Sequence, residues 1–241
     1  MNDEKNEDFD FCPVLQQMIS QQQWVDDDGS TYAAFGLSSN NNISIIRSLM
    51  MARQPERTME VGLSMGASAL TFAQSHADLG HAPQAQHTAI DPWQRPILHS
   101  IGLKAMERAG LTPYLHFDER TSDLSLPAFI EAGRSFQLIY IDGSHAFEDV
   151  FLDCHYAYHL LEPRGLVLFD DCADPSIAKV LKFIRRNMSY GLTEFDLTPH
   201  RPDKGRSFRY RAAKVLGLAH LAGFEKAGSG RRPVGHKTRR F

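Results

Sequence analysis

The sequence predicts one α/β domain built on a mostly parallel sheet, and two observations lead to that prediction. From about Thr58 onward, short apolar runs alternate with helical patterns, as stacked strand–helix–strand units require. The 241 residues are enough for one large domain and too few for two full-sized ones, and a 42% hydrophobic share is enough for a sizeable core. The expected fold class is a doubly wound α/β sheet preceded by an N-terminal helical cap.

The strands and helices are expected in a regular order. The clearest helix runs from Phe147 to Leu161, where apolar residues recur every three or four positions, and residues 177–184 repeat that pattern. Short apolar runs predict five strands, and two further runs predict a closing pair. The five cover residues 58–61, 86–91, 114–117, 136–142 and 165–171, and the closing pair covers 192–197 and 207–216.

The chain divides into three segments by composition. Residues 1–55 form a cap segment with two expected helices, around Cys12–Trp24 and Ile43–Ala52, which we expect to cover the site. Residues 56–218 form the main domain. Residues 219–241 are basic and rich in Gly, Ser and Pro, which predicts a flexible tail.

Charge and cysteine content exclude several classes of function. A net charge of -3 does not favour a nucleic acid as partner, since phosphate binding normally needs a basic surface. The three cysteines are far apart and form no CxxC pair, so neither a disulfide framework nor a zinc site is expected. No stretch reaches the roughly 20 apolar residues of a membrane span. We therefore expect a soluble, cytoplasmic protein.

A glycine-containing turn is the strongest local signal. In RTMEVGLSMGASAL a strand carries Glu60, Gly62 and Gly66 follow at a turn, and Ser68 opens a helix. A carboxylate here would repel a pyrophosphate but attract an ammonium or sulfonium group, which favours S-adenosylmethionine over a dinucleotide. A tight turn without a ligand is the alternative.

The next two strand ends add candidates for the nucleoside. Asp91 follows the second strand, where α/β nucleoside sites place a carboxylate that accepts hydrogen bonds from ribose hydroxyls. Glu119 follows the third strand and is a candidate for the adenine end. An aspartate at a strand end is also a common helix cap, so both readings of Asp91 stay open.

Three carboxylates are expected at the carboxyl ends of the fourth and fifth strands. These are Asp142, Asp170 and Asp171, and oxygen ligands of this kind suit Mg²⁺ or another divalent cation. Helix capping by Asp170 or Asp171 is the alternative. His145 lies on the loop after Asp142, where a neutral imidazole can take a hydroxyl proton, although a packed or capping histidine is a competitor.

Together, the pattern from Glu60 to Ser68, Asp91, the IDGSHAFEDV block and VLFDD resemble class I S-adenosylmethionine-dependent methyltransferases. The chain is most similar to the bacterial DGxH branch, which is Methyltransferase-24-like and includes macrocin-type sugar O-methyltransferases. The resemblance covers about residues 40–215. It implies a Rossmann-like, seven-stranded sheet with one antiparallel strand.

The resemblance also implies roles for single residues. Glu60 and the glycines would hold the methionyl group of the cofactor, and Asp91 the ribose. The metal-dependent members imply a divalent cation on Asp142, Asp170 and Asp171, and the DGxH histidine implies His145 as the base. The sequence departs from several relatives at Asp170-Asp171, where they have Glu-Asp or Asp-Asn.

The function expected is O-methylation of a small-molecule hydroxyl, with S-adenosylmethionine as cofactor, Mg²⁺ assistance, and Asp142 and His145 as the catalytic pair. The acceptor stays open between a sugar, a phenol and a polyketide-like alcohol. A metal-dependent hydroxylase-like enzyme on the same scaffold and a non-catalytic S-adenosylmethionine-binding protein are the alternatives. A nucleic-acid methyltransferase is disfavoured, because no DPPY-like motif follows the fourth strand. A homodimer is compatible with the resemblance.

Overall fold

The computed structural model describes residues 9–202, 212, 220–228 and 238–240, and a seven-stranded sheet forms its centre. The strand order is β5-β4-β3-β6-β7-β9-β8. The five strands from β5 to β7 pair in parallel, and β9 is antiparallel to both of its neighbours. The strands are β3 (Thr58–Val61), β4 (His87–Ile90), β5 (Leu115–Asp118), β6 (Phe136–Ile141), β7 (Leu161–Phe169), β8 (Leu192–Phe195) and β9 (Ala222–Lys226). This confirms the predicted doubly wound, mostly parallel sheet.

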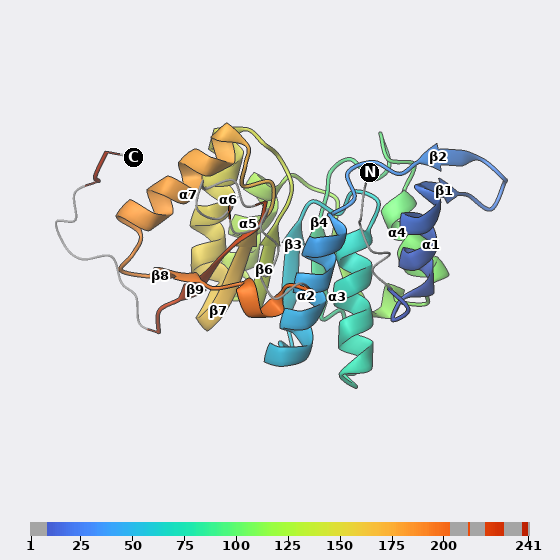
Figure 1. Ribbon diagram of the computed structural model, residues 1–241, viewed down its shortest axis with the longest axis horizontal. Helices are drawn as coiled ribbons and strands as arrows, with labels where there is room; N and C mark the ends of the chain where they lie inside the picture. The colour runs from blue at the N-terminus through green and yellow to red at the C-terminus, as the bar shows by residue number, and fades with distance from the viewer. Residues whose placement is uncertain (1–8, 203–211, 213–219, 229–237, 241) are drawn as a thin grey trace.

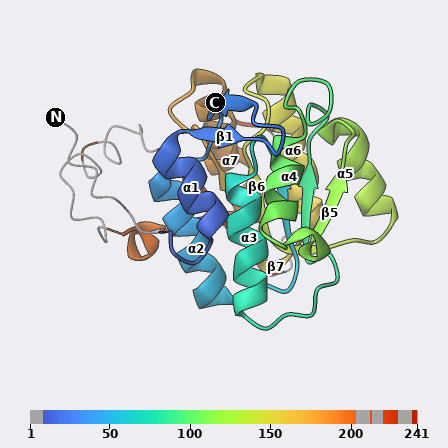
Figure 2. The ribbon, with the colours of Figure 1, turned by 90° about the vertical axis from the view of Figure 1, so that its right-hand side faces the viewer.

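Helices cover both faces of the sheet (Figure 1). One face carries α5 (Ser122–Glu131), α6 (Phe147–Leu160) and α7 (Pro175–Asn187). The other carries α2 (Asn40–Arg53), α3 (Ala67–Asp78) and α4 (Ile101–Arg108), with α1 (Pro13–Gln21) packed outside α3, and Figure 2 looks onto this face. Two short 3-10 helices, Thr112–Tyr114 and Thr198–His200, precede β5 and follow β8. Within the described ranges, no helix is long and apolar enough to cross a membrane.

Strand β3 lies at the centre of the sheet and faces both helical layers. Successive side chains of a strand point to opposite faces. Met59 and Val61 accordingly pack into the core beneath α5, α6 and α7. Thr58 and Glu60 point the other way, toward α3, and all four side chains are buried. The central strand therefore places two polar side chains inside the protein.

The N-terminal segment contains the two predicted helices, α1 and α2, separated by a hairpin of β1 (Gln23–Val25) and β2 (Thr31–Ala33). Helix α2 does not cover the site as the sequence suggested. It joins the layer that holds α3, because its apolar residues pack against β6 and β7. The stretch before it and the first turn of the helix, through Asn42, reach the site, and the Ser39 hydroxyl caps α2 by accepting from the amide of Asn42.

The last strand of the sheet is a correction to the sequence analysis. The strand predicted over residues 207–216 lies outside the described residues apart from residue 212, and β9 instead comes from the segment predicted to be a flexible tail. Phe224, which is 1% exposed, fixes this strand by packing edge-on against the ring of Phe169. The apolar signal is short and interrupted by Gly223, which is why the strand pattern was missed.

Candidate active site

A cavity of about 790 Å³ opens at the carboxyl ends of the central strands. Parallel α/β sheets bind ligands at this edge, where the strand order reverses. In this sheet the reversal lies between β3 and β6. Residues predicted for the cofactor, the base and the metal line the same cavity, namely Gly62, Asp91, Asp142, His145 and Asp171.

The turn after β3 is shaped by Gly62. Its φ of +95° lies in the left-handed region, and a Cβ at this position would come within 2.2 Å of the carbonyl oxygen of Asp142. The missing side chain thus lets the loop after β3 and the loop after β6 touch. Gly66 also has a positive φ, of +90°, but it packs against Gly102 and does not line the cavity.

Asp91, at the end of β4, is 4% exposed and holds the cavity wall together. Its Oδ2 accepts from the amides of Leu63 and Ser64, at 3.2 and 2.8 Å. The same oxygen accepts from Nε2 of Gln94, and Oδ1 accepts from the amide of Trp93 at 2.7 Å. The carboxylate therefore ties the turn after β3 to the loop after β4.

Glu60 does not line the cavity. Its side chain is fully buried behind the glycine turn, 3.2 Å from Nε2 of His87, and neither carboxyl oxygen makes a hydrogen bond. Burial raises the pKa of Glu60 well above its ordinary value, with a smaller rise from the charge of Asp91. Ser68 is also buried away from the cavity, on α3.

Glu119, the residue predicted for the adenine end of a nucleoside, also lies outside the cavity lining. It forms an ion pair with Arg95. Near Glu119 the cavity is lined by the residues that follow it in the chain and, on the opposite side, by apolar side chains from the loop after β4. They are Thr121, Ser122 and Asp123 on one side and Trp93, Ile97 and Leu98 on the other.

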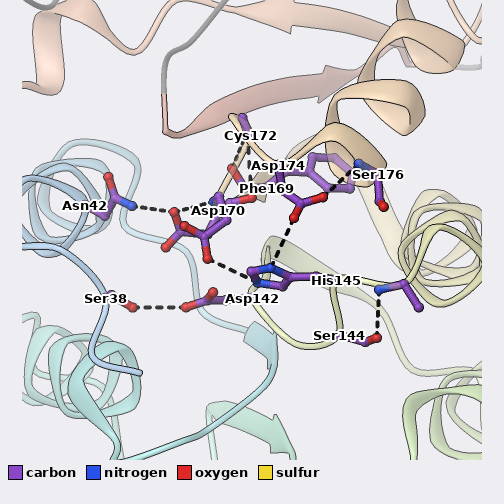
Figure 3. A network of polar contacts seen from close by, with 12 residues as sticks. Ser38, Asn42, Asp142, Ser144, His145, Phe169, Asp170, Cys172, Asp174 and Ser176 are labelled. Carbon is purple, nitrogen blue, oxygen red and sulfur yellow. Dashed lines mark hydrogen bonds and ion pairs between the residues drawn. The ribbon is translucent and has the colours of Figure 1, made fainter. Parts of the chain in front are cut away.

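Asp142 faces the cavity and belongs to a network of polar contacts (Figure 3). The hydroxyl of Ser38 donates to its Oδ2 at 3.1 Å and lies 3.2 Å from the hydroxyl of Tyr140. Burial raises the pKa of Asp142 well above its usual value, and the neighbouring Asp170 raises it further. The N-terminal segment thus supplies a donor to the central carboxylate of the site.

Asp170 is 5% exposed and does not line the large cavity. Its carboxylate accepts from Nδ2 of Asn42 and the amide of Asp171, each at 2.7 Å, and from the hydroxyl of Tyr140. These three donors occupy Asp170. Among the described residues no three His, Cys, Asp or Glu side chains converge as a metal site. The three acids predicted to bind Mg²⁺ are close in the fold, yet they do not form a ligand set.

His145 lies at the rim of the cavity between two carboxylates (Figure 3). Its Nε2 is 3.1 Å from Oδ2 of Asp171, and its Nδ1 is 3.7 Å from Oδ2 of Asp174. The side chains of His145 and Asp171 are each 48% exposed. Asp174 also caps α7 by accepting from the amide of Ser176. These two contacts orient the imidazole at the rim of the cavity.

Sequence reasoning missed three polar partners of the site, which are Ser38, Asn42 and Tyr140. Ser38 and Asn42 flank the start of α2, more than 100 residues before the acids that they contact. Their sequence signal, a run of serine and asparagine, is that of an ordinary helix start. Tyr140 occupies a buried strand position that reads as core, so no local pattern marks its hydroxyl.

Comparisons with known proteins agree with this fold. The family model described as a methyltransferase domain matches residues 59–172. The O-methyltransferase TomG from Streptomyces achromogenes, solved with S-adenosylmethionine, is 16% identical, with a TM-score of 0.62 over 92% of this chain and 91% of its own. An O-methyltransferase from Bacillus cereus, solved with S-adenosylhomocysteine, is 14% identical, with a TM-score of 0.56 over 88% of this chain and 89% of its own. No curated protein matches the chain in sequence.

The matched range begins in β3 and ends just after Asp171. It contains the glycine turn, Asp91, Asp142 and His145, which the structure gathers around one cavity. The family model therefore describes residues 59–172 as a methyltransferase domain, and the sheet order agrees with that match.

Proposed function

We propose that this cavity binds S-adenosylmethionine and directs its methyl group to a hydroxyl of a small molecule. The observation that carries the proposal is that one cavity is lined by Gly62 and Asp91 on one side and by Asp142 and His145 on the other. Its volume of about 790 Å³ is in the range of sites for small ligands and cofactors. The solved relatives bound to S-adenosylmethionine and S-adenosylhomocysteine support the choice of cofactor.

The methyl carbon of the bound cofactor supplies the electrophile. Nε2 of His145 lies 3.1 Å from Oδ2 of Asp171, and we assign the proton of the neutral ring to this nitrogen, which leaves Nδ1 to take the proton of the acceptor hydroxyl. The carboxylate of Asp174, 3.7 Å from Nδ1, stabilises the imidazolium that results. Asp142, held by Ser38, lies between the cofactor side and His145 and orients the acceptor hydroxyl.

The mouth of the cavity indicates the shape of the acceptor. Trp93, Ile97 and Leu152 line the cavity and are 53%, 55% and 38% exposed. Phe35, 55% exposed, adjoins Gly36 at the same cavity. Large exposed apolar side chains gathered around a cavity mark a binding surface. We therefore propose an acceptor that carries its hydroxyl on an apolar body.

The proposed mechanism does not use the divalent cation that the sequence predicts. Asp170 is held by three protein donors, and Asp171 by His145. The acids would have to exchange these partners before they could share an ion. Turnover in EDTA decides the question: full activity supports the metal-free step, and a loss that Mg²⁺ restores reinstates the metal prediction.

The first experiment is calorimetric titration with S-adenosylhomocysteine, with NAD as a control ligand. We expect S-adenosylhomocysteine to bind and NAD not to bind. Screening apolar alcohols with methyl-labelled S-adenosylmethionine then tests the transfer. Absence of S-adenosylhomocysteine binding would refute the proposal, and binding without transfer to any acceptor class would favour the non-catalytic alternative.

A further inference from the structure

Behind the glycine turn, a row of buried polar side chains connects Glu60 to the protein surface. Oγ1 of Thr58 lies 2.9 Å from Nδ1 of His87 and 2.9 Å from Nε2 of His76. Nδ1 of His76 lies 2.8 Å from Nδ1 of His81. Glu60, Thr58, His76 and His87 are fully buried, whereas His81 is partly exposed. The row therefore has one buried end and one end that reaches solvent.

The step nearest to Glu60 differs from the others. His87 Nε2 and Glu60 Oε1 are 3.2 Å apart and form no regular hydrogen bond, and the hydroxyl of Ser68 is the other polar group beside the Glu60 carboxyl group. Buried polar groups are normally paired, so an unpaired carboxyl group needs an explanation. Burial lowers the pKa of His76 and of His87 to about 3, which keeps both rings neutral.

The hydrogen positions in such a row are mutually dependent. A neutral histidine donates from one ring nitrogen and accepts at the other, and a hydroxyl can do both. The hydrogen bonds of the row can consequently all run in one direction or all in the other, and every histidine is neutral in both arrangements. In one direction His87 carries its proton on Nδ1 and accepts from a protonated Glu60. In the other, His87 carries it on Nε2 and donates to the Glu60 carboxylate.

Three other polar side chains lie near Glu60. Ser68 lies beside it on α3, Asp91 follows on β4, and Tyr140 is its register partner on β6. The hydroxyl of Tyr140 already donates to Asp170, and Asp91 is occupied by four N–H donors. The row of histidines is thus a continuous connection from Glu60 to the partly exposed His81.

We propose that Thr58, His76 and His87 relay a proton from Glu60 to His81, so that Glu60 becomes a carboxylate when a cationic cofactor occupies the adjoining cavity. Val61 and Gly62, the residues after Glu60, line that cavity. A positive charge there favours the ionised form of a nearby carboxyl group. The inference rests on the proposed function and makes Thr58 and the two buried histidines positioning residues.

The transfer balances with one proton. Glu60 gives its proton to Nε2 of His87, whose Nδ1 proton passes to Oγ1 of Thr58. The hydroxyl proton of Thr58 moves to Nε2 of His76, and the Nδ1 proton of His76 moves to Nδ1 of His81. His81 then releases its Nε2 proton to water. Glu60 ends as a carboxylate, and each other member ends neutral with its donor on the opposite side.

The test that needs no cofactor is ¹⁵N NMR of the imidazole rings across a pH titration. We expect both His76 and His87 to be neutral with the proton on Nδ1 at low pH, and to switch together to Nε2 as Glu60 ionises. In Glu60→Gln the joint switch is absent. A free protein in which the two rings switch separately, or in which the switch persists in Glu60→Gln, would overturn the proposal.

The second test measures proton release on cofactor binding. The heat of S-adenosylmethionine binding is measured in buffers of different ionisation enthalpy. Its dependence on the buffer is expected to correspond to the release of close to one proton per cofactor bound in the wild type, and to none in Glu60→Gln. Thr58→Val removes the central hydroxyl, so dye-detected release should slow by at least about tenfold relative to binding. Thr71→Val is the matched control, since that buried hydroxyl donates to the carbonyl of Ala67 instead.

The outcomes separate the two proposals. Binding heat without dependence on the buffer refutes the relay and leaves the cofactor assignment intact. Absence of binding heat refutes the cofactor assignment, and the NMR titration of the free protein still decides the relay. Equal release rates in Thr58→Val and the wild type would show that the proton leaves by another route.

Discussion

The two walls of the cavity are built differently. The first wall, formed by the loops after β3 and β4, is tied together by the buried Asp91 with its four N–H donors and by the close approach at Gly62. The second wall, formed by the loops after β6 and β7, presents His145 and Asp171 with half of each side chain exposed. A preformed wall suits one ligand of fixed shape, and an open wall suits proton transfer with an acceptor that enters from solvent.

Replacing His145, on the second wall, should give the largest effect, and it should reduce turnover without weakening cofactor binding at the first wall. His145→Gln removes the proton acceptor, so kcat is expected to fall by about 10²–10⁴-fold. The affinity for S-adenosylhomocysteine should stay unchanged, because the first wall is intact. His155→Gln, at an exposed histidine on α6, is the control. Steady-state kinetics and calorimetry check both values, and an equal loss in the two variants would contradict the assignment.

The pH dependence of stability should reveal a buried charge beneath the second wall. Asp153 on α6 is 1% exposed, and burial raises its pKa to about 7. The native state keeps this proton while the unfolded state loses it near 3.8, so stability falls as pH rises from about 4 to about 7 and then levels off. The loss from this group reaches up to about 4 kcal/mol.

Asp153→Asn should remove that loss. Urea unfolding at pH 4 and pH 8 is expected to show a variant close to wild type at the lower pH and more stable at the higher. His76 and His87 act in the opposite direction, because their pKa values of about 3 weaken the fold as pH falls below 6.5. The comparison is therefore made between variant and wild type at each pH. A constant difference would mean that Asp153 does not titrate in this range.

A methyl group at Gly62 should disrupt the first wall. In Gly62→Ala the new Cβ would overlap the carbonyl of Asp142, and we expect a loss of about 3 kcal/mol in unfolding free energy together with weaker S-adenosylhomocysteine binding. Gly29→Ala is the matched control, since its φ is +86° and no atom lies within 4 Å of the added carbon. There only the backbone strain of about 1–2 kcal/mol applies. Similar unfolding of the two variants would argue against the close approach.

The smallest effect is expected at Asp91. Asp91→Asn keeps the shape of the side chain but places an NH₂ group where a carboxylate oxygen accepted from backbone amides. The lost hydrogen bonds should cost about 1–3 kcal/mol. That cost should appear as an affinity for S-adenosylhomocysteine lower by about 10–100-fold. Asp118→Asn is the control, because Asp118 ends the neighbouring strand β5 but forms an ion pair with Arg120 and does not line the cavity. Calorimetry on both variants separates the two positions, and an unaltered affinity in Asp91→Asn would remove Asp91 from the cofactor side.

Local patterns predicted most of the fold, because buried strands and amphipathic helices leave periodic signals. Strand β6 and helix α6 were found within a residue or two for that reason. β9 was missed, since five residues with one glycine and two charges carry no clear period. Its place is set by Phe224 packing on Phe169, which is a long-range contact that no local window contains.

The site was predictable to the extent that strand ends determine it. Asp91 and Asp142 directly follow strands, and His145 comes three residues after Asp142, so topology brings them together. Glu60 was also expected at the cavity, but residue alternation along β3 turns it to the opposite face, toward His87. Asn42 could not be found, because its contact with Asp170 depends on how α2 packs across the sheet.

The place of β9 has a consequence for the order in which the chain can assemble. β9 lies between β7 and β8, and in the described part of the chain β8 pairs with β9 alone. During synthesis the outer edge of β7 therefore stays open until residues 222–226 have emerged. An open, apolar strand edge invites pairing with other chains. A version truncated before Ala222 should thus aggregate during expression, even though every residue of its cavity is present.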